Sequence, residues 1–162
     1  MSYPAPRYHG EGGEATAWIR LHVAPHDLDH ASGGSVDYLA VGTATDGEFG
    51  LYRWNFAPGR SGPDPHFHRT ISESFFVLSG TVRLYDGTGW KDAGPGDFMH
   101  VPPGGLHGFR NESGEAASML LLFTPGAPRE EYFETLAGIG FGRAVTADER
   151  ADLYRRHDTY WI

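Results

Sequence analysis

Two short histidine-containing segments constrain the fold of this chain more than any other feature. The first contains His66, His68 and Glu73, and the second contains His107 with a Pro-Pro-Gly-Gly turn just before it (102–105). Alternate side chains of a β-strand point to the same face, so His66 and His68 are expected to share one face. Such a face can hold a metal ion between the two imidazoles. The two segments therefore predict strands that meet around a cation.

The spacing within these segments resembles the two sequence motifs of the cupin superfamily. The first motif is His-x-His, four residues, Glu, six residues and Gly, and the second is Gly-x5-Pro-x-Gly-x2-His-x3-Asn. The chain meets them, with 15 residues between the motifs, at His66, His68, Glu73, Gly80, Gly96, Pro102, Gly104, His107 and Asn111. One position departs from the family: its opening Gly is Arg60 here. Gly59 and Gly62 flank Arg60, so a shifted turn is expected and the ligand positions are not affected.

The resemblance implies an all-β fold, a cupin jelly-roll β-barrel, and a metal site. It implies that one divalent transition metal per subunit binds to His66, His68, Glu73 and His107. The chain has no cysteine, and a thiolate-free set of imidazoles and a carboxylate suits Fe, Ni, Mn, Co, Cu or Zn without selecting among them. Four protein ligands leave coordination positions open, whereas structural zinc closes its shell. The alternatives are three ordinary partly buried histidines, or a cupin whose metal is only structural or has been lost.

Composition and charge exclude several classes of function. At 162 residues, with 40% hydrophobic residues, the chain suits one folded domain. The formal net charge of −8 argues against nucleic acid as a partner, because phosphate binding requires clustered Lys and Arg. The chain has no basic amphipathic stretch and no apolar run of membrane-spanning length, so no membrane partner is expected. Residues 1–20 lack the pattern of a signal peptide, so a cytoplasmic location is expected.

The predicted elements divide the chain into three parts. Residues 1–15 are expected to form a flexible N-terminal arm, residues 16–125 the cupin β-barrel, and residues 126–162 a helical extension that packs on the barrel. Short apolar runs between Gly and Pro residues predict strands at 18–23, 36–44, 49–56, 74–78, 81–85, 98–101, 108–110 and 118–124. Helical apolar spacing predicts one short helix over 129–137, and the capping-box pattern at 146–149 predicts a second.

Two residues are candidates for a catalytic role. Glu73 can act as a general base if it leaves the metal, but it lies five residues beyond His68 and needs a bend at Thr70–Ile71 to point inward. His100 can act as a proton relay or bind substrate if its face of the strand lies inside the barrel, and is otherwise a surface histidine.

Other residues are candidates for binding. The aromatic and apolar side chains expected to line a substrate pocket, each with core packing as the alternative, are Tyr52, Trp54, Phe56, Phe75, Met99 and Phe109. The polar loop 25–34 carries four potential metal ligands, and a solvated turn is favoured there over a second metal site.

A second resemblance concerns the region after the barrel. Segments 132–136 and 153–157 are similar to the tail of bacterial quercetin-dioxygenase-like cupins. This resemblance implies a metal-dependent dioxygenase acting on a small aromatic or polyphenolic substrate, with Glu73 as both ligand and base. Single-domain cupins often dimerise by strand exchange, which implies a homodimer. The alternatives are a zinc-dependent polyketide cyclase or isomerase, and a non-catalytic cupin that binds a small ligand.

Overall fold

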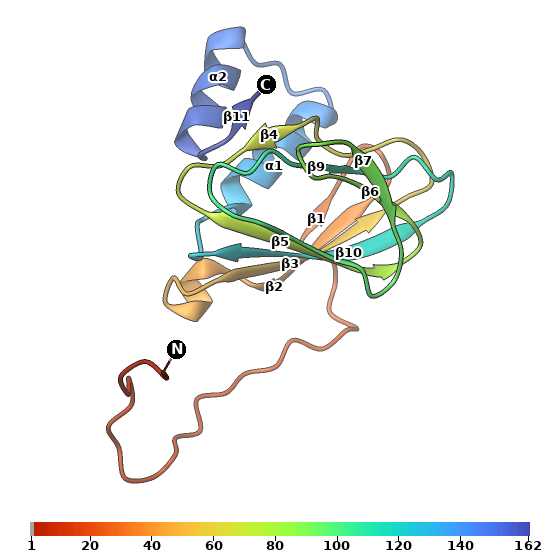
Figure 1. Ribbon diagram of the computed structural model, residues 1–162. Helices are drawn as coiled ribbons and strands as arrows, with labels where there is room; N and C mark the ends of the chain where they lie inside the picture. The colour runs from red at the N-terminus through yellow and green to blue at the C-terminus, as the bar shows by residue number, and fades with distance from the viewer. Residues whose placement is uncertain (1) are drawn as a thin grey trace.

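The computed structural model describes residues 2–162, and its strands and helices follow the predicted order (Figure 1). The strands are β1 (Leu28–Asp29), β2 (Ser35–Ala40), β3 (Gly50–Phe56), β4 (His66–Phe67), β5 (Ser72–Ser79), β6 (Val82–Tyr85), β7 (Trp90–Ala93), β8 (Phe98–Val101), β9 (Gly108–Arg110), β10 (Ala117–Thr124) and β11 (Tyr160–Trp161). The α-helices are α1 (Glu130–Gly140) and α2 (Ala147–Arg156), and a short 3-10 helix spans Gly42–Thr45. No helix within residues 2–162 is both long and apolar enough to cross a membrane.

The strands pair into three antiparallel sheets. The largest has six strands in the order β1-β2-β3-β10-β5-β8, the second has the order β7-β6-β9, and the third consists of β11 and β4. In Figure 1, β4, β6, β7 and β9 lie across the six-stranded sheet, and α2 lies with β11 at one end of the molecule. The predicted all-β jelly roll with two C-terminal helices is confirmed.

The hydrophobic core lies on the inner face of the six-stranded sheet. Along β10, alternate residues are buried, as the two-residue period of a strand requires. Leu121 is aligned with Tyr52 on β3 and with Phe75 on β5, and all three side chains are fully buried. Removing this apolar surface from water is the main force that holds the sheet against the strands opposite it.

Both predicted helices form, but only α2 has a side-chain cap at its start. α1 extends to Gly140 rather than Ala137, and its buried face carries Tyr132 and Phe133. α2 begins with the predicted capping box: the Thr146 hydroxyl accepts a hydrogen bond from the Glu149 backbone N–H at 3.2 Å, and Thr146 N–H donates to the Glu149 carboxylate at 2.7 Å.

Two predicted strands differ in the structure. The predicted strand 18–23 pairs with no other segment, and Ile19 and Val23 are 80% and 85% exposed. Alternation alone does not form a strand without a neighbouring edge. The predicted strand 36–44 ends at Ala40, before the 3-10 helix that closes with Asp46 in the left-handed conformation.

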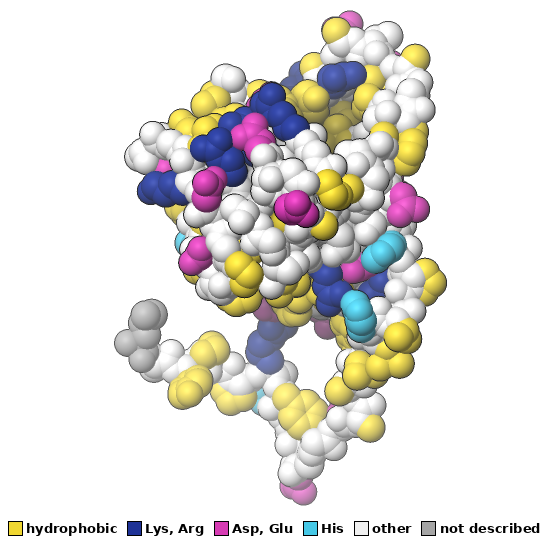
Figure 2. All heavy atoms as spheres, turned by 90° about the vertical axis from the view of Figure 1, so that its right-hand side faces the viewer, with side chains coloured by type: hydrophobic (Ala, Val, Ile, Leu, Met, Phe, Trp, Pro, Cys, Tyr) yellow, Lys and Arg dark blue, Asp and Glu magenta, His cyan; other side chains and the backbone are white. Residues whose placement is uncertain are grey.

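The amino-terminal residues lie apart from the sheets. Residues 2–27 contain no helix or strand, and Met1 lies outside the described residues. Figure 2 shows this segment extending away from the body of the molecule, on whose visible face basic side chains lie beside acidic ones. The boundaries at residues 15 and 125 stay predictions.

Candidate metal centre

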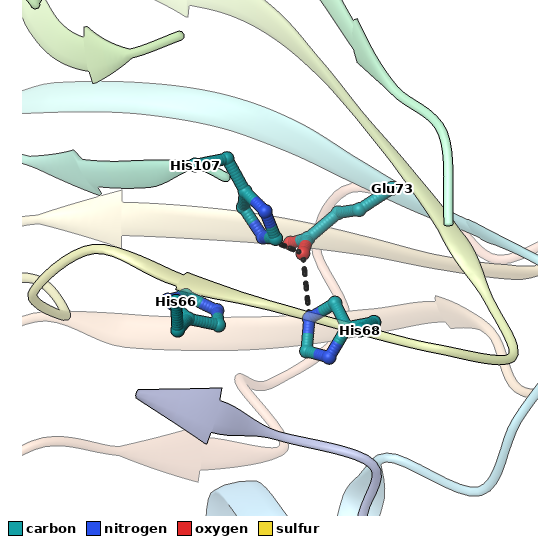
Figure 3. Close-up of side chains that lie close together, drawn as sticks. All are labelled: His66, His68, Glu73 and His107. Carbon is teal, nitrogen blue, oxygen red and sulfur yellow. Dashed lines mark hydrogen bonds and ion pairs between the residues drawn. The ribbon is translucent and has the colours of Figure 1, made fainter. Parts of the chain in front are cut away.

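The four predicted ligands lie together at one place in the fold. His66 is on β4, His68 follows β4, Glu73 is on β5 and His107 precedes β9. The backbones of His66 and His107 pair directly through two hydrogen bonds of 2.8 and 2.9 Å. All four side chains are buried and point toward one another (Figure 3), and one ligand atom from each lies within 4.8 Å of the others. This cluster can hold a metal ion.

Backbone carbonyls set the orientation of the three imidazoles. In each ring Nδ1 is within hydrogen-bond distance of a carbonyl oxygen, which can only accept, so Nδ1 carries a proton and Nε2 is the nitrogen that faces the cluster. Nε2 of His68 and of His107 lies within hydrogen-bond distance of the Glu73 carboxylate, which also only accepts, so a metal ion would replace any proton on these nitrogens. The carbonyls of Asp64, Gly105 and Asp158 accept from His66, His107 and His68 respectively, the first two at 2.9 and 3.0 Å. Such outer hydrogen bonds are typical of metal-ligating histidines, because they select the tautomer and hold the ring.

The charge states of the cluster also suit a cation. Burial raises the pKa of Glu73, but hydrogen bonds with His107 (2.9 Å) and His68 (3.2 Å) outweigh burial and bring that pKa well below its usual range. Burial lowers the pKa of His66 to about 3. Burial is the largest single influence on His107 and lowers its pKa, but the hydrogen bond with Glu73, the charge of Glu73 and the hydrogen bond with the Gly105 carbonyl together outweigh burial and raise that pKa. The set therefore offers an ionised carboxylate and imidazole nitrogens, which fits a divalent transition metal.

The bend that turns Glu73 inward is held by the far end of the chain. The chain bends at Arg69–Thr70, where β4 ends and β5 enters a different sheet. The Asp158 carboxylate accepts hydrogen bonds there from Arg69 N (3.0 Å), Thr70 N (2.8 Å) and Thr70 Oγ1 (2.7 Å). Because the Asp158 carbonyl also accepts from His68, the turn after α2 positions a ligand and the bend together.

A cavity of about 450 Å³ opens against the cluster, with His66 and Glu73 in its wall. Six of its 15 other lining residues are aromatic, and they come from β3, β9, the two helices and β11: Trp54, Phe109, Tyr132, Phe133, Tyr154 and Trp161. β11 pairs with β4, which aligns Trp161 with His66, and the two rings lie 5.0 Å apart. A larger surface groove of about 790 Å³, beside residues 18–24, contains none of the predicted ligands.

The six candidates for substrate binding fall into three groups. Trp54 and Phe109 line the cavity. Tyr52, Phe56 and Phe75 do not line it; they are buried in the core, which was the alternative for each. Met99 does not line this cavity either; it packs against the core and lines a smaller pocket together with residues of β6 and β7.

The structure contradicts a catalytic role for His100. In the pairing of β5 with β8, His100 is opposite Ser74, and its Nδ1 lies 2.9 Å from Ser74 Oγ. Glu73 and Phe75 are buried on the inner face, so Ser74, which lies between them, points outward. His100 is paired with Ser74 and therefore points outward as well. The imidazole is exposed on the outer face of the sheet and cannot reach the ligands.

Sequence reasoning missed several residues that form or support the site. His30, from the polar loop, lines the cavity with its ring 4.7 Å from that of Trp54, and burial lowers its pKa. Within residues 2–162 no second cluster of metal-ligating side chains occurs, in this loop or elsewhere. Arg129, Tyr154 and Trp161 line the cavity, and they lie in segments whose apolar spacing predicts only helices or no element.

Comparisons with known proteins agree with this geometry. The family described as "Cupin domain" matches residues 52–123. The chain is 32% identical over 118 residues to quercetin 2,3-dioxygenase of Bacillus subtilis, a match that covers 73% of this chain and 34% of that protein. The chain thus spans about a third of the length of this relative.

Two solved structures are similar as well. A sugar phosphate isomerase of the cupin superfamily from Silicibacter pomeroyi is 31% identical with a TM-score of 0.50, covering 63% of this chain and 66% of that chain. The polyketide cyclase RemF from Streptomyces resistomycificus is 22% identical with a TM-score of 0.53, covering 67% of this chain and 80% of that chain. The latter likeness concerns the fold alone.

Proposed function

From the cupin domain matched at residues 52–123 we propose that this chain is a metal-dependent oxidoreductase of the dioxygenase type, acting on a small aromatic or polyphenolic substrate. One observation carries the proposal: the ligand cluster forms part of the wall of an aromatic cavity of about 450 Å³. A cavity of this size and lining suits a drug-sized aromatic molecule. The partial likeness to a quercetin dioxygenase supports the reaction type.

The residues of the chain divide the work of such a reaction. A divalent transition metal held by the four ligands would supply Lewis acidity and, if it is redox-active, dioxygen chemistry. Glu73 is ionised and lines the cavity, so its carboxylate can accept the proton of a substrate hydroxyl. Trp54, Phe109 and Trp161 offer ring faces and edges against which an aromatic substrate can pack.

A non-redox isomerase or cyclase is the second candidate. The likeness to a sugar phosphate isomerase, at 31% identity, favours it. In this case zinc would bind to the same four residues, and Glu73 would move a proton between two positions of the substrate.

Metal analysis combined with oxygen uptake tests both candidates. The protein is purified without added metal, its metal content is measured, and oxygen consumption is followed with flavonols and catechols. Bound iron, nickel, manganese, cobalt or copper with substrate-dependent oxygen uptake supports the dioxygenase. Bound zinc without oxygen uptake favours the isomerase or cyclase, and a metal-free protein that takes up no metal overturns both. The homodimer stays a prediction, which sedimentation in solution would check.

A further inference from the structure

A buried positive charge lies in the same cavity as the ligand cluster. Arg129, immediately before α1, lines the cavity and is only 3% exposed. Its Nη1 donates a hydrogen bond to the carbonyl of His157, and its Nε has no partner. Within residues 2–162 no carboxylate oxygen lies within 4 Å of this guanidinium. The charge of Glu73 acts on this guanidinium only from beyond direct contact and offsets the cost of burial in part, so the position suits an anion.

The surroundings of the guanidinium show which nitrogen is available. Nη1 is used by the backbone and Nε is buried against the protein, which leaves Nη2 as the donor that can reach the cavity. The plane is held by aromatic rings, with the guanidinium carbon 4.4 Å from the centre of the Tyr132 ring and 5.5 Å from that of Phe133. A fixed, charged N–H donor suits a carboxylate oxygen.

No acidic side chain of the cavity serves as this partner. Glu73 is the one carboxylate among the lining residues, and its Oε2 is already engaged by His107 and His68. His30 also lines the cavity, and burial favours its neutral form. The cavity therefore offers the guanidinium aromatic rings and a neutral imidazole, but no carboxylate that is free of the ligand cluster.

We propose that the cavity takes an aromatic carboxylic acid, whose carboxylate accepts a hydrogen bond from Nη2 of Arg129 and whose ring lies among Trp54, Phe109 and Trp161. The proposal names the substrate class of the proposed function and rests on that function for turnover. Binding of the acid by Arg129 does not require a metal.

Calorimetric titration of the metal-free protein tests the proposal. The protein is treated with a chelator and titrated with 2-naphthoate and with 2-naphthamide, which has the same shape but no charge. Hydrogen bonds between charged groups predict that the wild type binds the acid at least about tenfold tighter than the amide. Arg129→Gln is expected to remove this preference while keeping the affinity for the amide. The exposed Arg150→Gln is the matched control and should keep the preference.

Several outcomes would overturn the proposal. Equal affinities for acid and amide in the wild type would do so, and so would a wild type that binds neither at millimolar concentration. An unchanged preference in folded Arg129→Gln would have the same meaning. If Arg129→Gln does not fold, Arg129→Lys keeps the charge but lacks the planar guanidinium that the aromatic rings hold in place, and should lower the acid preference. Because no metal is present, a failure of the proposed function leaves these results interpretable.

Discussion

The candidate site has two halves, which come from different regions of the chain and contribute different groups. The strand region, residues 66–107, contributes the four ligands at fixed spacings. The C-terminal region, residues 129–161, contributes much of the cavity wall, the buried guanidinium and the hydrogen bonds that hold His68 and the bend before Glu73. The residues that bind the metal and most of the residues that would contact the substrate can therefore change separately. Changes in each half should therefore give different defects.

The largest defect is expected in the strand half, from His66→Ala combined with His107→Ala. Two of the four ligands are lost, so metal content should fall to near zero while the sheets survive. Elemental analysis and circular dichroism measure the two properties. His100→Ala, which removes an exposed imidazole on the outer face, is the control and should keep full metal content. Full metal stoichiometry in the double variant would disprove the ligand assignment.

The next largest effect is expected from Asp158→Ala, a change in the C-terminal half that weakens the metal site of the strand half. The change removes hydrogen bonds to Arg69 N, Thr70 N and Thr70 Oγ1, so the bend that directs Glu73 inward loses its support. Loss of outer support typically weakens a metal site by about 10- to 100-fold. Titration against a competing chelator measures the affinity, with the exposed Asp148→Ala as control. Unchanged affinity would show that the strand half orients its ligands alone.

A smaller effect is expected in the C-terminal half alone, from Trp161→Ala. The ring packs beside His66 and forms part of the cavity wall, but it binds no metal. Affinity for 2-naphthamide should fall by about two- to tenfold through lost aromatic contact, with metal content unchanged. Calorimetry measures the affinity, and Trp18→Ala, outside this cavity, should leave it unaltered. Loss of metal in the Trp161 variant would mean that the two halves are not separable.

The smallest expected effect is on the pH dependence of stability. Burial raises the pKa of Asp158, but hydrogen bonds from Thr70 and Arg69 outweigh burial and lower it. A carboxylate with a lowered folded pKa stabilises the fold above its unfolded pKa of about 3.9, and this contribution is lost as the pH falls through the folded value. Because Asp158 is partly exposed, we expect less than about 1 kcal/mol. Urea unfolding should separate wild type from Asp158→Asn more at pH 7 than near pH 3, and a constant difference would contradict this.

The parts of the site that could be predicted from the sequence are those encoded over short distances. The ligands follow from their spacing, and the second helix follows from the capping box at Thr146 and Glu149. The outward orientation of His100 could not be predicted, because it depends on which residue of β5 it faces. The run at 18–23 alternates like a strand but has no neighbour to pair with.

The C-terminal wall could not be predicted for a different reason. β11 contains two residues, too few to show a period, and it forms because β4 offers an edge at His66 and Phe67. Arg129 reads as an ordinary helix start in the sequence. Its role emerges only when the cavity brings it close to residues far away in the chain.

The hydrogen bond between His68 and the Asp158 carbonyl has a consequence for the order of biosynthesis. The two residues are 90 positions apart, so a ribosome translates the whole jelly roll and both helices before the partner of His68 exists. A nascent chain can pair its strands during this interval, but its site is still open on the side that β11 will cover. The complete metal site therefore forms late, and a product that stops before residue 158 is expected to fold its two larger sheets but bind metal poorly.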